Sequence, residues 1–130
     1  MSGALSRLLV VRTCGYLERT VIVCVRSYLS SKGEPRVSRF GSSWLNTGIN
    51  PRPTRLIELV ERFDDTWADD LREKFSDNDS ELMREISFLV DRRIRIAHGQ
   101  SESVGARKAL DLIPYADYLA DWFLEKFDPR

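Results

Sequence analysis

Apolar residues recur at every third or fourth position along most of this chain, and that spacing constrains the fold more than any other feature of the sequence. Side chains at such intervals share one face of an α-helix, whereas a half-buried β-strand needs strict alternation, which no segment shows convincingly. The 130 residues are also enough to bury a core without a metal ion or disulfides. The sequence therefore predicts an all-α fold, a four- to five-helix bundle.

Two long helices are predicted in the first part of the chain. The first runs over residues 2–31, and we prefer it to a short strand at residues 21–25 because the helical phase continues on both sides. Its apolar side chains are Leu5, Leu8, Leu9, Cys14, Leu17, Val21, Ile22, Val25 and Leu29. The second begins at Thr54, a plausible N-cap, and its apolar stripe continues to Phe75.

Two further helices follow a polar stop. For the third, Asn78 and Glu81 are spaced as a capping box, and Gly99 stands where a glycine ends a helix. The last helix follows a short loop, and Pro114 either kinks it or begins a separate piece at the next residue. Its carboxylates at positions 117, 121 and 125 recur every four residues, which we interpret as an exposed acidic edge rather than a partner-binding ridge.

Residues 32–53 are rich in glycine and proline, and they predict a long loop with a short helical turn near residues 40–45. We place this loop as an insertion between the first two long helices of a single domain, residues 1–130. Loops of this length in small domains usually carry function or are mobile. The loop is therefore a candidate for substrate contact.

Cysteine usage and hydropathy indicate a cytoplasmic protein. Cys14 and Cys24 are ten positions apart on one predicted helix, so their Cα atoms should lie about 15 Å apart and cannot form a disulfide with each other. No apolar stretch long enough to cross a membrane is free of charged residues. We expect neither a membrane span nor a signal peptide, and reduced thiols fit a cytoplasmic location.

A net charge of zero conceals strong segregation of charge along the sequence. Residues 56–91 sum to −8, whereas residues 32–55 and residues 92–108 each sum to +4. The acidic helix either pairs with the basic segments inside the molecule or leaves a basic groove for a polyanion. Charge runs are usually solvated faces, so composition alone does not choose the second.

The segment Leu89–Gln100, LVDRRIRIAHGQ, places three arginines and the chain's only histidine within seven residues. An imidazole moves protons near neutral pH, and guanidinium groups match phosphate oxygens. That pairing suits metal-independent RNA cleavage, in which the 2′-hydroxyl of the RNA attacks the adjacent phosphorus. The alternative explanation is structural, because basic residues in the last turn of a helix commonly stabilise it by complementing the helix dipole. One histidine and two cysteines without zinc-binding spacing predict no metal site, and glycine-rich phosphate loops are absent, so no cofactor is expected.

The residues Arg93-Ile-Arg-Ile-Ala-His98-Gly, at the end of the third helix, resemble the Arg-x4-6-His motif of the HEPN superfamily. The flanking residues 89–92 and Gly99 are similar to a branch of stand-alone HEPN proteins associated with bacterial RNA cleavage. The likeness extends over most of the chain in helix order, but only residues 89–99 are specific. It implies a HEPN-like fold, with Arg93 and His98 as catalytic residues and Glu18 of the first helix in support.

The same resemblance implies partners and a biological setting. It predicts a metal-independent endoribonuclease, and a homodimer whose two motifs face each other across one cleft. It also implies a toxin-antitoxin or antiphage role, with an antitoxin or regulatory protein as partner.

One position departs from the pattern. Members usually carry a polar residue, often asparagine, directly after the motif arginine, and this chain has Ile94. The supporting role then falls to Arg92 or Arg95, or the domain is a non-catalytic module that binds RNA, nucleotide or a protein. A third hypothesis is nucleotide transfer by another enzyme onto His98 or Tyr115. Five helical residues also rotate His98 by about 140° from Arg93. The two side chains should converge only where the helix end unwinds or a partner subunit completes the site.

Basic and aromatic residues mix in the predicted loop. Arginine side chains bind phosphates, and aromatic rings stack on unpaired bases. The residues we expect to contact RNA are Arg36, Arg39, Trp44 and Arg52. Trp44 has the alternative role of fixing the loop to the core.

Overall fold

The computed structural model describes residues 2–36, 39, 41, 45, 48–100 and 104–128. The regular secondary structure of these residues is helical throughout, which confirms the predicted all-α fold. The helices are α1 (Gly3–Lys32), α3 (Pro53–Glu61), α4 (Asp65–Ala97), α5 (Ala106–Asp111) and α6 (Ile113–Lys126). Trp44, predicted to contact RNA, lies outside the described residues.

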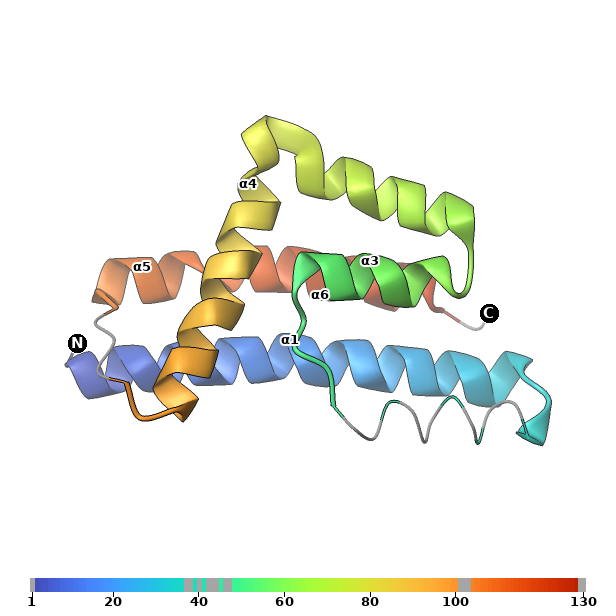
Figure 1. Ribbon diagram of the computed structural model, residues 1–130, viewed down its shortest axis with the longest axis horizontal. Helices are drawn as coiled ribbons and strands as arrows, with labels where there is room; N and C mark the ends of the chain where they lie inside the picture. Colours follow the sequence, from blue (N-terminus) through green and yellow to red (C-terminus); the bar gives the residue numbers. More distant parts are fainter. Residues whose placement is uncertain are drawn as a thin grey trace.

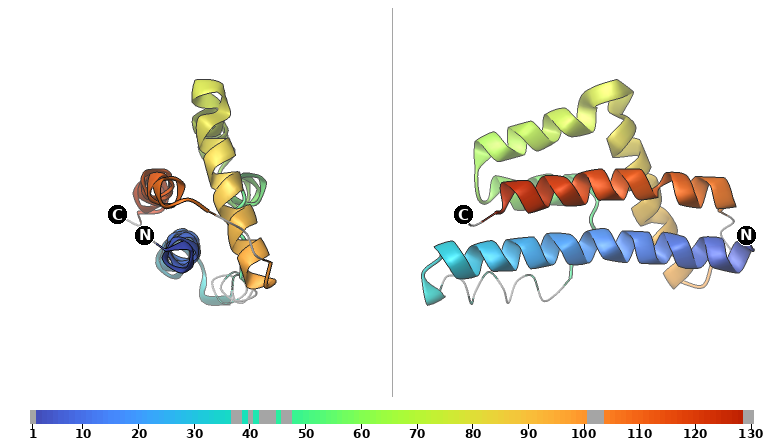
Figure 2. Two further views of the ribbon diagram at one scale, coloured as in Figure 1. Left: turned by 90° about the vertical axis from the view of Figure 1, so that its left-hand side faces the viewer. Right: turned by 180° about the vertical axis from the view of Figure 1, so that it is seen from behind.

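The helices form two layers (Figure 1). In one layer α1 and α6 lie side by side and run in the same direction, with α5 leading into α6 (Figure 2). In the other layer α3 and α4 pack against each other, and the C-terminal part of α4 crosses α1 steeply. Fully buried side chains from both layers form the core, among them Val10, Leu17, Leu71, Phe75, Ile86, Leu89, Leu119 and Phe123.

The first predicted helix is confirmed with nearly the expected bounds. Ser2 is its N-cap, and the Ser2 hydroxyl accepts a hydrogen bond from the Leu5 N–H at 3.2 Å. The helix ends at Lys32, and the N–H of its C-cap, Gly33, donates to the Leu29 carbonyl. Its length carries the chain past α4, α5 and α6, which all pack against α1, whereas α3 packs against α4.

The second predicted helix is two helices, so that expectation was wrong. α3 ends at Glu61, and α4 begins at Asp65. Asp64 causes the break, because its Oδ1 accepts hydrogen bonds from the N–H groups of Thr66 at 2.8 Å and Trp67 at 3.3 Å and so starts a new helix. The predicted N-cap was also wrong. Arg52 occupies that position, and Pro53 begins the first turn.

The predicted polar stop is confirmed as a kink within α4. Asn78, Asp79 and Ser80 have φ values of 54°, 54° and 61°, a left-handed conformation that costs non-glycine residues about 1–2 kcal/mol each. The expected capping box does not form. The Asn78 amide instead donates to the side chain of Glu81 at 3.3 Å. The kink separates a first arm, residues 65–76, from a second arm, residues 81–97.

The other two predicted breaks differ in outcome. The described residues within 32–53 include helical positions at 35, 36, 39, 41 and 45, so this segment has more helix than the predicted loop. Pro114 begins a separate helix, as one of the two alternatives had it, with α6 starting one residue before the proline. Missing a backbone N–H, the proline fits the first turn of α6, where that group needs no helical partner.

Candidate functional site

The end of α4 and the middle of α1 border an open hollow of about 610 Å³. The second arm of α4 brings its C-terminus across α1 at this point (Figure 1). Three segments that are distant in sequence line the hollow. Its lining residues are Val11, Glu18, Asn50, Arg93, Ile94, Ile96, Ala97 and His98.

Arg93 is fixed in the hollow by side chains from two other segments. Its Nη1 donates to Glu18 Oε1 at 3.2 Å and its Nη2 to Glu18 Oε2 at 3.5 Å, a two-pronged contact with α1. Nη2 also donates to Asn50 Oδ1 at 2.6 Å. The Arg93 side chain keeps only 17% of its surface exposed. The guanidinium is therefore held in one orientation with its charge partly balanced by Glu18.

His98 stands at the exposed end of the same helix. α4 ends at Ala97, and His98 is its C-cap, with φ −87° and ψ 11°. Gly99 follows with φ +75°, the left-handed conformation that ends a helix and favours glycine. His98 lines the same hollow as Arg93, although five positions of helix set the two residues about 140° apart around the axis of α4.

The neighbouring arginines point elsewhere. The Arg92 guanidinium lies 4.6 Å from the centre of the Phe88 ring, and Arg95 Nε forms an ion pair with Asp91 Oδ2 at 3.1 Å. Neither lines the hollow. Ile94, the residue at which the motif departs from its usual pattern, does line it and presents an apolar side chain.

Asn50 is the lining residue that the sequence did not indicate. It precedes Pro51 in a segment predicted as loop, 43 residues before Arg93. The only signal was its place between a basic stretch and the start of α3. Its Oδ1 faces Arg93, so the amide nitrogen of the same side chain is directed away from the guanidinium. An amide group thus stands beside the arginine although position 94 lacks one.

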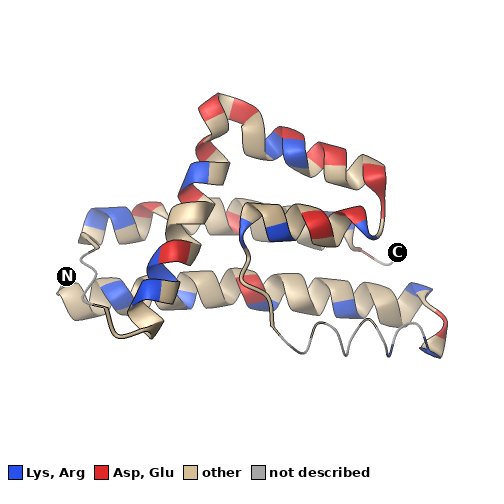
Figure 3. Cartoon of the chain, viewed as in Figure 1, with Lys and Arg blue, Asp and Glu red and all other residues tan. Residues whose placement is uncertain are grey.

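The predicted RNA-contacting arginines all lie on the surface. Arg36, Arg39 and Arg52 are exposed, and Arg52 is the N-cap of α3, two residues after Asn50. Charge along α4 is segregated as the sequence predicts. Carboxylates concentrate on the first arm, while basic residues gather on the second arm toward the hollow (Figure 3).

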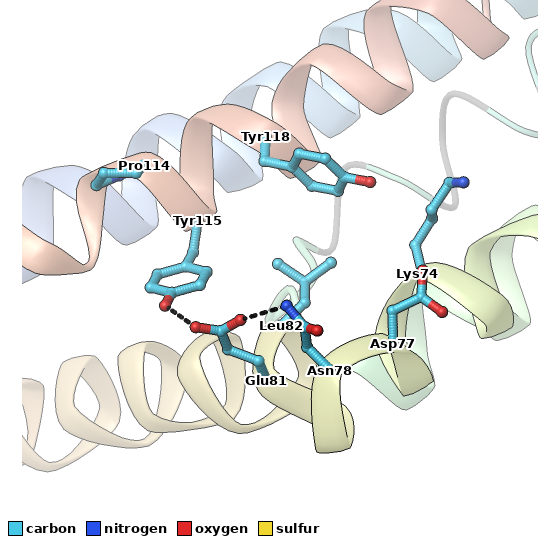
Figure 4. Close-up of a pocket in the computed structure, with 8 residues that line it drawn as sticks. All are labelled: Lys74, Asp77, Asn78, Glu81, Leu82, Pro114, Tyr115 and Tyr118. Carbon is cyan, nitrogen blue, oxygen red and sulfur yellow. Dashed lines mark hydrogen bonds between the residues drawn. The ribbon is translucent and has the colours of Figure 1, made fainter.

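A second hollow lies between the kink of α4 and α6 (Figure 4). Three of its polar side chains bind one another. The Tyr115 hydroxyl donates to Glu81 Oε1 at 2.6 Å, a hydrogen bond that raises the pKa of Tyr115 to about 12. Glu81 also accepts from Asn78. These contacts join α6 to the kink. We choose the hollow at the end of α4 as the candidate site, because the His98 imidazole is exposed there and the lining groups suit phosphate chemistry.

Three other features bear on the sequence predictions. Cys14 and Cys24 are both buried and free, as predicted. In the described part of the chain, no helix is long and apolar enough to span a membrane. The same residues include no cluster of three or more histidine, cysteine, aspartate or glutamate side chains placed to hold a metal ion.

The comparison with known protein families matches residues 2–127 to the family described as RiboL-PSP-HEPN. Comparisons with curated proteins and with solved structures found no match. The matched range includes the Arg93–His98 motif, its Glu18 partner and each of the helices. The chain belongs to the RiboL-PSP-HEPN family, and its predicted membership of the HEPN superfamily is confirmed.

Proposed function

We propose that this protein is a metal-independent endoribonuclease that cleaves single-stranded or loop RNA through the RNA's own 2′-hydroxyl. The observation that supports the proposal is that Arg93 and His98 both line one hollow although five helical positions separate them. Arginine binds and stabilises phosphate charge, and histidine transfers protons near neutral pH. Family membership supports the same activity.

In this mechanism Arg93 is the phosphate clamp. Its contacts with Glu18 and Asn50 engage three of the five guanidinium N–H groups, which leaves Nε–H and one Nη1–H for phosphate oxygens. The extra negative charge of the pentavalent intermediate strengthens those bonds in the transition state. Glu18 and Asn50 orient the clamp before substrate binds, which lowers the cost of positioning it.

His98 transfers the protons. As general base it takes the proton of the 2′-hydroxyl, whose oxygen then bonds to the adjacent phosphorus. The bond from phosphorus to the 5′-oxygen breaks, and that oxygen takes up a proton from a general acid. The products are a 2′,3′-cyclic phosphate and a 5′-hydroxyl. DNA lacks the attacking hydroxyl and is spared.

Two proton-transfer groups serve this reaction best, and the chain has one histidine. We therefore propose a homodimer in which the two motifs face each other across one cleft, so that one imidazole acts as base and the other as acid. A toxin-antitoxin or antiphage setting, with an antitoxin or regulatory protein as partner, is part of the same proposal.

The test incubates purified protein with end-labelled single-stranded RNA in EDTA. We expect cleavage with 2′,3′-cyclic phosphate ends that is abolished in His98→Ala and reduced by at least about a hundredfold in Arg93→Ala, as for loss of a group that stabilises transition-state charge. Arg107→Ala is the matched control, because that arginine is highly exposed and does not line the hollow. DNA of the same sequence should stay intact. Cutting that does not depend on His98 would reject the proposal.

A non-catalytic RNA-, nucleotide- or protein-binding module is the second candidate. Ile94 favours it, because an apolar side chain occupies the wall of the hollow where the motif usually has a hydrogen-bonding group. RNA affinity that is lost in Arg93→Ala, with no cyclic phosphate formed by the wild-type protein, would select this function.

A further inference from the structure

The exposed large apolar side chains of the described residues all lie on α1, α5 and α6. Their exposed fractions range from 44% for Val23 to 55% for Leu5. The set is Leu5, Leu8, Tyr16, Val23, Leu110, Tyr118 and Leu124. Apolar surface that gathers on one layer of a small protein usually marks a binding surface.

These side chains form one row on each helix. On α1, helical spacing places the row within an arc of about 80°, facing away from the core. That row is Leu5, Leu8, Arg12, Tyr16, Arg19 and Val23. On α5 and α6, a second row falls within about 60° by the same spacing. It consists of Leu110, Asp117, Asp121 and Leu124. Tyr118 lies off this row, at the second hollow.

The two rows adjoin on one face of the molecule. α1 and α6 pack directly against each other. Burial and then the nearby carboxylates of Asp117 and Asp121 raise the pKa of Tyr16. Tyr16 therefore marks the level at which the rows meet. Seen from behind, α1 and α6 lie in front of α3 and the end of α4 (Figure 2). We name the surface made by the two rows the α1–α6 face.

The rows carry opposite charge. Arg12 and Arg19 are exposed on α1, and neither forms an ion pair with another described residue. Asp117 and Asp121 are exposed on α6. By the helical rise, Arg12 and Arg19 lie about 10.5 Å apart along α1, and Asp117 and Asp121 about 6 Å apart along α6. The difference is a few ångströms at each end, which a long arginine side chain can bridge.

We propose that a second copy of this chain binds the α1–α6 face, with a two-fold axis parallel to α1 and α6. This axis places α1 of each copy against α6 of the other and keeps the register of the rows. Arg19 then lies opposite the partner's Asp121, and Arg12 opposite the partner's Asp117. The apolar ends of the rows cover one another on both sides of these pairs.

Charge selects this arrangement over the other two-fold pairing of the face. An axis perpendicular to the helices sets α1 against α1, which brings Arg12 and Arg19 of the two copies together and repels them. The parallel axis replaces that repulsion with two sets of opposite charges. A self-complementary surface of this kind is what an isologous dimer requires.

This contact is independent of the proposed nuclease. The hollow that holds Arg93 and His98 lies on the other side of α1, beside the end of α4. Pairing through the α1–α6 face leaves that hollow open in each copy. Together with a dimer whose motifs face each other, it closes into a tetramer if the two two-fold axes cross at right angles.

Two charge-reversal variants test the proposal by their behaviour apart and together. Native mass spectrometry and analytical ultracentrifugation at micromolar concentrations would measure the assembly mass of wild type, Arg19→Glu and Asp121→Arg. We expect each variant alone to have half the mass of the wild-type assembly, because like charges then meet across the face. An equimolar mixture should recover the wild-type mass, because in a mixed pair every substituted side chain meets its opposite.

The matched control is Arg55→Glu, the same charge reversal at an exposed arginine of α3 in the other layer. It should keep the wild-type mass. Circular dichroism checks that every variant retains wild-type helicity, as expected for exposed positions. A monomeric wild type, an unchanged mass in either variant, or no recovery on mixing would each overturn the proposal.

Discussion

Arg93 is held by two side chains from distant parts of the chain, Glu18 and Asn50. We expect Asn50 to orient the Arg93 guanidinium. The residue lies in the open and lines the hollow, so its removal should not disturb the core. A hydrogen bond to a charged group contributes about 1.5–3 kcal/mol. Its loss leaves the Arg93 guanidinium free to swing about the Glu18 contact.

For Asn50→Ala we therefore predict a kcat for RNA cleavage at least about tenfold lower, the equivalent of about 1.4 kcal/mol. KM should change less, because Arg93 and its charge remain. Kinetics on a defined RNA and a thermal melt measure both effects, and Gln100→Ala, an exposed residue just beyond the motif, is the control. Unchanged kcat, or a fall in kcat matched by a fall in melting temperature, would remove Asn50 from the site.

Among single residues, the motif pointed to Arg93 and His98 and the family resemblance added Glu18, and all three line one hollow. The sequence did not identify Asn50, because its role depends on a contact with a residue 43 positions away and its neighbours form no motif. Arg92 and Arg95 show the reverse case. Their charge and position favoured support of the site, but the helix turns one onto Phe88 and the other onto Asp91.

The helices themselves were predictable where spacing and breakers agree. α1 and the glycine end of α4 follow both signals. The break between α3 and α4 did not follow spacing, because the apolar residues Val60, Phe63 and Trp67 keep a helical period across it. The side chain of Asp64 makes the break by capping two N–H groups, a local hydrogen-bonding choice that periodicity does not report.

The Asp64 cap should give the fold a specific pH dependence. A hydrogen bond from the Thr66 hydroxyl, and then hydrogen bonds from the capped backbone N–H groups, lower the pKa of Asp64 below that of an ordinary aspartate. A carboxyl whose folded pKa lies below the unfolded value stabilises the fold above the unfolded pKa, and that contribution is lost as pH falls through the folded pKa. The stabilisation by the Asp64 cap should therefore be lost in acidic solution, below about pH 4.

We predict that Asp64→Ala lowers the urea midpoint by a constant amount from pH 7 to about pH 5, and that the difference from wild type shrinks below about pH 4. Circular dichroism during urea unfolding at several pH values measures it. Asp65→Ala, one position further on, leaves both capping bonds in place and should show a smaller change. A difference that persists undiminished in acid would contradict the role of the ionised cap.

An aromatic cluster joins the C-terminus of α6 to the start of α4 and the end of α1. Phe127 is 2% exposed, and its ring centre lies 5.5 Å from Tyr28, 5.2 Å from Phe63 and 5.2 Å from Trp67. We predict that Phe127→Ala lowers the free energy of unfolding by about 3–5 kcal/mol, since the truncation leaves a cavity among rigid rings. Urea denaturation measures it. Tyr118→Ala, half exposed on the same helix, should cost less, and equal losses would show that the cluster is not tightly packed.

Across the whole molecule, the sequence predicted helix content but not which faces stay uncovered. The apolar residues of α1 surround the helix, so spacing alone counted Leu5 and Leu8 with the core, and the structure leaves both about half exposed. Burial is decided by where α4 and α6 pack, which depends on the kink and on the α3–α4 turn. From the sequence alone, the acidic row on α6 is interpreted as a solvated edge. Only the structure, which sets this row beside the basic row of α1, suggests that a partner binds there.

Charge segregation should also govern how the whole molecule binds RNA. The net charge is zero, so attraction to a polyanion depends on local basic surface rather than on overall charge. Each phosphate contact releases counterions, and for single strands it adds about 0.7 to the slope of log affinity against log salt concentration. Arg36, Arg39 and Arg52 are exposed and are the predicted contacts.

For Arg52→Ala we predict a salt slope shallower by about 0.7, with weaker binding at low salt and little difference at high salt. Fluorescence anisotropy with labelled single-stranded RNA would measure it, in a His98→Ala background that prevents cleavage. Combining the change with Arg36→Ala and Arg39→Ala should reduce the slope by about 2 in total, because the contacts act separately. Arg107→Ala in the same background controls for loss of positive charge elsewhere on the surface. A slope that stays constant through the series would mean that RNA reaches the hollow by another route.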